Sequence, residues 1–121
     1  MREIKFRAWQ EDAVEKDLRF WTWKEMLDHD LNAMVNSPKY KIMQYTGLKD
    51  NNGTEIYEGD ILTDHGDGGP LYVEYSNEHA AFVFVDKFDP FGTTSYTTLQ
   101  ISYEQFEIIG NIYEHPHLLG D

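Results

Sequence analysis

Carboxylates are the side chains of this chain whose spacing most resembles a catalytic arrangement. Four of them fall within ten positions: Glu55, Glu58, Asp60 and Asp64. If the segment is a strand, Glu58, Asp60 and Asp64 lie on one face, because side chains alternate along a strand. Carboxylates crowded on one face can serve general acid–base chemistry of the glycosidase kind or bind Mg²⁺. Solvated surface charge is the more ordinary interpretation, and we predict no catalytic residue here.

Two histidines, His115 and His117, flank Pro116 near the end of the chain and suggest a metal site. A metal needs about four ligands in fixed geometry, which a proline-broken segment does not readily provide. The chain has no cysteine, so thiolate ligands, disulfides and cysteine nucleophiles are excluded. Phosphate-binding loops, dinucleotide fingerprints, serine hydrolase elbows and zinc protease motifs are also absent from the sequence. We therefore expect a protein without enzymatic activity, cofactor, bound metal or small-molecule substrate.

The charge of the chain changes sign near its middle. Residues 1–49 carry nine basic and eight acidic side chains, whereas residues 50–121 carry fourteen acidic side chains and one basic one, Lys87. An acidic surface repels phosphates, because nucleic-acid affinity depends mainly on Lys and Arg. Nucleic acid is therefore a disfavoured partner. The acidic half is either a solubilising surface or a surface that meets a basic partner.

The elements that would position these residues are mainly β-strands. The alternation in residues 4–9 predicts a half-buried strand, and apolar residues at spacings of three and four predict one helix over 23–35. Further strands are expected at 40–48, 55–63, 71–75, 80–86, 96–101 and 107–113, with Ser102 capping one helical turn. The fold class is mainly β with minor α, as an N-terminal strand–helix arm over residues 1–42 and a small β-barrel over 43–121.

The segment from residue 44 to residue 62 predicts a hairpin with a tight turn. A two-residue turn would set two acidic side chains, Asp50 and Glu55, opposite each other. A three-residue loop with Gly53 in the left-handed conformation instead pairs Lys49 with Glu55. It also pairs two apolar residues, Leu48 and Ile56. Each cross-strand pair contributes about 0.2–1 kcal/mol, which favours the second register. The residues expected to define this structural turn are Leu48, Lys49, Asp50, Gly53, Glu55 and Ile56.

Three short segments, in order along the chain, resemble the YopX family, small proteins encoded by phages and prophages of bacteria. They are MREIKFRAW at 1–9, MQYTGLKD with EIYEGDI at 43–61, and IGNIYE at 109–114. The resemblance implies an SH3-like barrel in the C-terminal part and a mobile-element origin. It assigns no catalytic residue and no established activity. With no apolar run at the start or elsewhere that suits a signal peptide or membrane helix, we expect a soluble protein of the bacterial cytoplasm.

Aromatic residues are the strongest indication of function. Tyr and Trp are enriched at protein interfaces, and five of them are candidates for an interface: Trp9, Trp21, Trp23, Tyr72 and Tyr75. The alternative is that they form a core between arm and barrel. We expect an accessory protein that acts by binding a protein partner or by forming a homo-oligomer.

Two other functions stay open. A nucleic-acid-binding SH3-like module would have to use the basic side chains of the arm: Arg2, Lys5, Arg7, Lys39 and Lys41. An acidic mimic of DNA would instead use the carboxylates of the second half to occupy a host nucleic-acid-binding protein. That complex would dissociate steeply with added salt.

Overall fold

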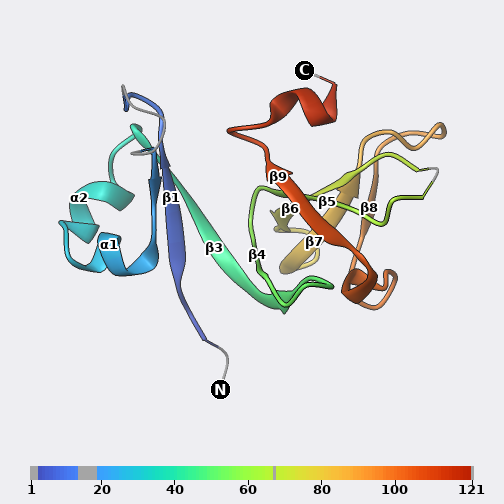
Figure 1. Cartoon of the computed structure of the whole chain (residues 1–121), viewed down its shortest axis with the longest axis horizontal. Coiled ribbons are helices and arrows are strands. Elements are labelled where there is room, and N and C mark those ends of the chain that lie inside the picture. Colours follow the sequence, from blue (N-terminus) through green and yellow to red (C-terminus); the bar gives the residue numbers. More distant parts are fainter. Residues whose placement is uncertain (1–2, 14–18, 67, 121) are drawn as a thin grey trace. The chain divides into compact units, whose positions relative to one another are not determined.

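The computed structural model describes residues 3–13, 19–66 and 68–120. The chain divides into two compact units, residues 1–45 and 46–121, each built on a β-sheet (Figure 1). Strands predominate over a few short helices, so the predicted mainly β fold is confirmed. The division lies inside one long strand, three residues after the boundary expected from the sequence.

The first unit packs two short helices on a small sheet. Strand β1 (Phe6–Gln10) pairs antiparallel with β2 (Phe20–Trp21) on one side and with β3 (Tyr40–Lys49) on the other. The helices are α1 (Trp23–Leu27) and α2 (Leu31–Val35). Ala8, Met26 and Met34 are buried together, so the inner face of β1 and one residue from each helix make the core of this unit.

The prediction of a single helix over residues 23–35 is wrong, because the structure has two helices there, each with its own capping side chain. Thr22 and Glu25 form a capping box that starts α1. The Asp30 carboxylate accepts a hydrogen bond from the Ala33 N–H and starts α2. Asp side chains compete with helical hydrogen bonds in mid-helix and favour caps, so apolar spacing continued across a break that Asp30 imposes.

The second unit is a five-stranded antiparallel sheet, curled into a half-barrel, with strand order β8-β7-β6-β5-β9. Its strands are β5 (Asp60–Thr63), β6 (Leu71–Ser76), β7 (Ala81–Asp86), β8 (Thr94–Tyr96) and β9 (Glu107–Asn111). The short β4 (Glu55–Tyr57) pairs with β3. Short 3₁₀ helices lie on either side of β9, η2 (Tyr103–Gln105) and η3 (Pro116–Leu119).

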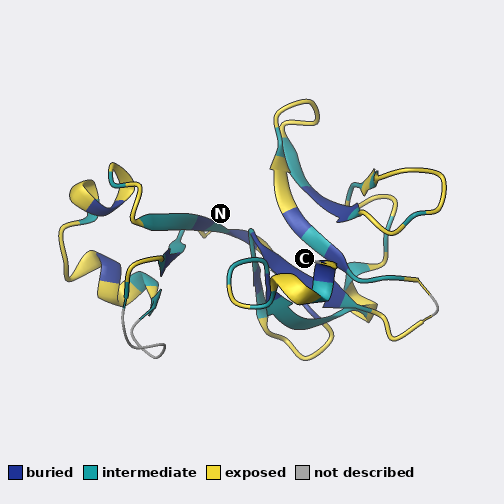
Figure 2. Cartoon of the chain, turned by 90° about the horizontal axis from the view of Figure 1, so that it is seen from above, coloured by how far each residue is buried: buried dark blue, intermediate teal, exposed yellow. Residues whose placement is uncertain are grey.

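Apolar residues from several strands form the core of this half-barrel. Figure 2 shows the strands largely buried or half-buried and the connections largely exposed. The buried cluster consists of Ile56, Leu62, Leu71, Val73 and Phe84. Four strands contribute to it, so the core depends on the register between them.

The strand predicted at residues 96–101 is mostly a turn. Strand β8 ends at Tyr96, where the Thr97 N–H donates to the Gln100 side chain and the Gln100 N–H donates to the Thr97 carbonyl. Ser102 does not cap η2 with its side chain, contrary to the prediction. Local hydrogen bonds thus turn the chain away from the sheet, although Thr and Tyr favour strands.

The turn between β3 and β4 is built around Asp50. Its N–H donates to the Thr54 carbonyl, its carbonyl accepts from the Gly53 N–H, and Gly53 has φ +79°. These bonds place Asp50 opposite Thr54 across a three-residue loop with a left-handed glycine. The pairs beyond the loop, Lys49 with Glu55 and Leu48 with Ile56, stay predictions of that register.

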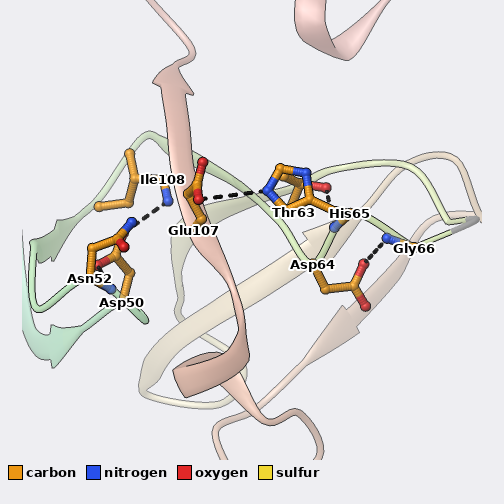
Figure 3. Close-up of polar contacts among 8 residues, drawn as sticks. All are labelled: Asp50, Asn52, Thr63, Asp64, His65, Gly66, Glu107 and Ile108. Atoms are coloured by element: carbon orange, nitrogen blue, oxygen red, sulfur yellow. Dashed lines mark hydrogen bonds and ion pairs between the residues drawn. The ribbon is translucent and has the colours of Figure 1, made fainter.

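The Asp50 side chain also contacts β9, which is far along the sequence (Figure 3). One carboxylate oxygen accepts from the Asn52 and Thr54 N–H groups, each at 2.9 Å. The other accepts from the Ile108 N–H at 3.0 Å, 58 positions along the chain. Burial alone would raise the pKa of Asp50, but the three N–H donors outweigh it and hold the pKa below its ordinary value of 3.8.

Replacing Asp50 should destabilise the second unit. Asp50→Ala leaves three N–H groups without their acceptor, and we expect the free energy of unfolding to fall by about 2–4 kcal/mol in urea titrations. Asp86→Asn is the matched control, because an amide can still accept its single N–H bond from Phe88. An Asp50→Ala protein as stable as the wild type would contradict this role.

The same carboxylate should make stability depend on pH. Because folding lowers the pKa of Asp50, its contribution is complete well above the ordinary value and is lost as pH falls through the folded-state value. The difference in unfolding free energy between wild type and Asp50→Asn should therefore be constant from about pH 6 to 8 and shrink below about pH 4. A difference that grew on acidification would have the wrong sign.

Candidate functional site

A hollow of about 400 Å³ lies at one end of the half-barrel. Its walls come from the β5–β6 connection, the end of β7, strand β8 and the connection from β8 to β9. The lining residues are Asp64, Gly68, Gly69, Leu71, Asp86, Tyr96, Gln100, Ile101, Ser102, Gln105 and Phe106. The hollow thus gathers segments that are far apart in the sequence.

The lining combines apolar side chains with negative charge. Leu71 belongs to the buried core, and Tyr96, Ile101 and Phe106 pack against that core while remaining half-buried. Two carboxylates, Asp64 and Asp86, complete the wall, and none of the lining residues is basic. Such a surface suits a ligand that carries an apolar group beside a positive charge.

Each of these carboxylates also holds its own loop. The Asp64 carboxylate accepts from the Gly66 N–H at 2.9 Å (Figure 3), and that of Asp86 accepts from the Phe88 N–H at 2.9 Å. Phe88 lies against Gly69, where an added Cβ would come within 2.5 Å of its ring. Only glycine permits this approach, so the rim of the hollow is held by short-range packing.

Between β7 and β8, Phe91 projects into solvent from a hydrogen-bonded turn. The Asp89 carboxylate accepts from the Phe91 N–H and from the Thr94 hydroxyl, at 2.9 and 2.7 Å. These two bonds lower the pKa of Asp89. The Gly92 N–H donates to the Asp89 carbonyl. The Phe91 side chain is nevertheless 98% exposed, so the turn presents it outward.

Leu99, which follows β8 in the sequence, is also held at the surface by a hydrogen-bonded turn. It lies within the Thr97–Gln100 turn and is 96% exposed. Phe91 precedes the first residue of β8 by three positions, and Leu99 follows the last by three. They are the two most exposed large apolar residues among those the structure describes.

The three tryptophans predicted as interface residues pack within the first unit. Trp21 and Trp23 lie against the cluster of Ala8, Met26 and Met34, and the Trp21 indole donates to the Gln10 side chain. The Trp9 ring is buried, meets Phe20 edge-on at 5.0 Å and lies under the Arg19 guanidinium. These contacts give the tryptophans a role in packing, and their part in an interface stays a prediction.

Of the two predicted tyrosines in the half-barrel, one is accessible. Tyr75 is 46% exposed and meets Phe82 edge-on across the β6–β7 pair. Tyr72 is half-buried, and burial together with the Glu74 charge raises the pKa of its hydroxyl. Neither tyrosine lines the hollow.

The carboxylate cluster considered for catalysis is not a single group in space. Asp60 is buried and accepts from the Tyr57 N–H at 2.8 Å, which closes the turn between β4 and β5. Asp64 lies at the hollow, where a nearby histidine, His65, contacts Glu107 at 3.6 Å. Within residues 3–13, 19–66 and 68–120, no three His, Asp or Glu side chains converge as metal ligands.

Phe91 and Leu99 were missed in the sequence for different reasons: Phe91 falls in a connection between predicted strands, whereas Leu99 was assigned to the strand predicted at 96–101. The local pattern did hold an indication for the first of them. Residues 88–92 read Phe-Asp-Pro-Phe-Gly, a composition typical of an exposed turn, and a second aromatic inside such a turn cannot easily be buried. Leu99 follows two threonines and carried no comparable indication.

One comparison with known proteins identifies the family of this chain, and another shows its fold. The family model described as "YopX protein" matches residues 5–120. The crystal structure of protein EF1440 from Enterococcus faecalis is similar, with a TM-score of 0.59 and 24% sequence identity over 98% of this chain and 99% of that one. Among proteins with curated descriptions none matches. No helix in the described part of the chain is both long enough and apolar enough to cross a membrane. Because the family model covers nearly the whole sequence, the chain belongs to the YopX family.

Proposed function

We propose that this YopX-family protein is a non-enzymatic accessory protein that binds another protein through its half-barrel. The observation that carries the proposal is that the half-barrel combines a hollow of about 400 Å³ with two almost fully exposed apolar side chains, Phe91 and Leu99, which flank β8 in the sequence. The phage or prophage origin and the bacterial cytoplasm, which the family resemblance implies, belong to the same proposal.

The free energy of burying Phe91 and Leu99 favours a role for both side chains in binding. Burying a side chain such as Phe or Leu stabilises by about 1.5–3 kcal/mol, so leaving both in water forgoes that gain. Bonded turns hold both residues at the surface, and a preorganised apolar side chain loses little freedom on binding. Aromatic anchors that enter a partner's pocket are typical of protein interfaces.

Nucleic-acid binding is the weaker alternative, because three of the five basic side chains that it would use make local contacts. Lys39 pairs with Asp12 at 3.5 Å and Lys5 with Glu3 at 3.4 Å, while Arg7 lies over the Phe20 ring. Arg2 lies outside the described residues. The acidic mimic of DNA is a special case of protein binding, and the salt dependence of the complex distinguishes it.

Self-association through the half-barrel is disfavoured by charge. Residues 50–121 carry fourteen acidic side chains and one basic one, so two copies would bring like charges together. A different protein with a basic surface is the better partner.

Photocrosslinking tests the proposal in cells of the source organism. A benzophenone amino acid at position 99 should capture a partner protein, identified by mass spectrometry, and Phe91→Ser in the same chain should reduce that capture at least about fivefold. The control carries the crosslinker at position 27, an exposed leucine of α1. Equal capture of the same proteins from both positions, or no loss with Phe91→Ser, would contradict it.

A further inference from the structure

The two edges of the five-stranded sheet are not equivalent. At the β9 edge, the β3–β4 turn makes two hydrogen bonds: the Ile108 N–H donates to the Asp50 carboxylate, and the Asn51 N–H donates to the Phe106 carbonyl. The start of that edge is therefore in contact with another part of the chain. At the other edge, β8 pairs with β7 through Tyr96, Ser95 and Thr94.

Strand β8 retains backbone groups for a further strand. Successive residues of an antiparallel strand direct their N–H and C=O groups to opposite sides. With three consecutive residues paired to β7, at least one directs its backbone groups outward. No hydrogen bond between described residues engages the outer side of β8, and such an edge is a template for an added strand.

Exposed edges are usually kept short to prevent association, and a length of three residues fits that ordinary purpose. The flanks of β8 argue otherwise, because protected edges carry charges or proline rather than large apolar groups. Phe91 and Leu99 lie three positions before and after the strand and are almost fully exposed. A segment laid along β8 would pass between them.

Charge indicates what that segment carries. Asp86 pairs with Thr94 of β8, so the carboxylate lies beside the edge, and it lines the hollow together with Asp64 and Tyr96. None of the residues that line the hollow is basic, and the one basic residue of the acidic half, Lys87, follows Asp86 in the chain. Because side chains alternate between the two faces of a strand, the Lys or Arg side chains of an added strand would face the hollow, with their apolar stems near Tyr96 and their charges near Asp64 and Asp86. The apolar side chains would lie on the opposite face.

We propose that β8 binds an extended basic segment of a partner protein by strand addition, with alternate apolar and Lys or Arg side chains. This inference rests on the proposed protein-binding function and specifies its mode. A second copy of this chain is the poorer occupant, because its own Asp64 and Asp86 would face those of the first.

Titration of the ¹⁵N-labelled full chain with synthetic hexapeptides tests the mode directly. The probe alternates valine and lysine; one control alternates valine and glutamate, and a second carries N-methyl groups on its central valine–lysine amides. We expect the valine–lysine peptide to shift the amide signals of residues 94–96. The N-methylated peptide should bind at least about tenfold more weakly, because it cannot donate to the strand. The glutamate peptide should not bind.

Isosteric variants test whether the negative charges of Asp64 and Asp86 contribute to peptide binding, and they preserve the hydrogen bonds that hold the turns. Asp64→Asn combined with Asp86→Asn keeps both acceptors but should weaken lysine-peptide binding roughly threefold to tenfold. Glu78→Gln, which removes one negative charge from the exposed β6–β7 connection, is the control for each single variant, Asp64→Asn or Asp86→Asn, and should change affinity by less than about twofold.

The outcomes separate the two proposals. Equal binding of the N-methylated peptide, or shifts confined to residues outside 91–99, would overturn strand addition. Failure of the lysine peptide to bind, while position 99 still crosslinks a partner in cells, would overturn the basic segment and leave protein binding intact. Failure of both experiments would overturn the proposed function as well.

Discussion

The carboxylate of Asp50 is the interaction on which the second unit most depends. It accepts three backbone N–H groups, two from its own turn and one from Ile108. A buried charge is tolerated only when it is fully hydrogen-bonded, so the turn and β9 have to stay together. One result is that the turn occupies the start of the β9 edge, whereas no hydrogen bond between described residues engages the outer side of β8, the other edge of the sheet.

Within the half-barrel, the strands and the turns have different roles. Buried residues from four strands hold the sheet, whereas the turns around Asp89 and Thr97 present Phe91 and Leu99 to solvent. Glycine allows Phe88 to pack tightly at the rim of the hollow. The strands thus position loops whose turns are held by hydrogen bonds, and binding residues often lie on loops positioned by a rigid scaffold.

The predictions from sequence succeeded where one local pattern determined the outcome. Alternation located β1, two short strands joined by a turn located the β6–β7 pair, and the mainly β class followed from such patterns. The helix over 23–35 failed because apolar spacing does not reveal that Asp30 caps a new helix. The candidate site was missed because the hollow joins residues from Asp64 to Phe106, and no local pattern shows which loops meet. Exposure of Phe91 and Leu99 likewise follows from turn geometry rather than from residue type.

Amide hydrogen exchange on the complex with the captured partner tests the central claim most directly. The account predicts that binding slows exchange across residues 91–99, with β8 protected most, while the β9 amides, already bonded to β5 and the Asp50 turn, change little. Protection confined to residues 3–45, with residues 91–99 exchanging as fast as in the free protein, would contradict it.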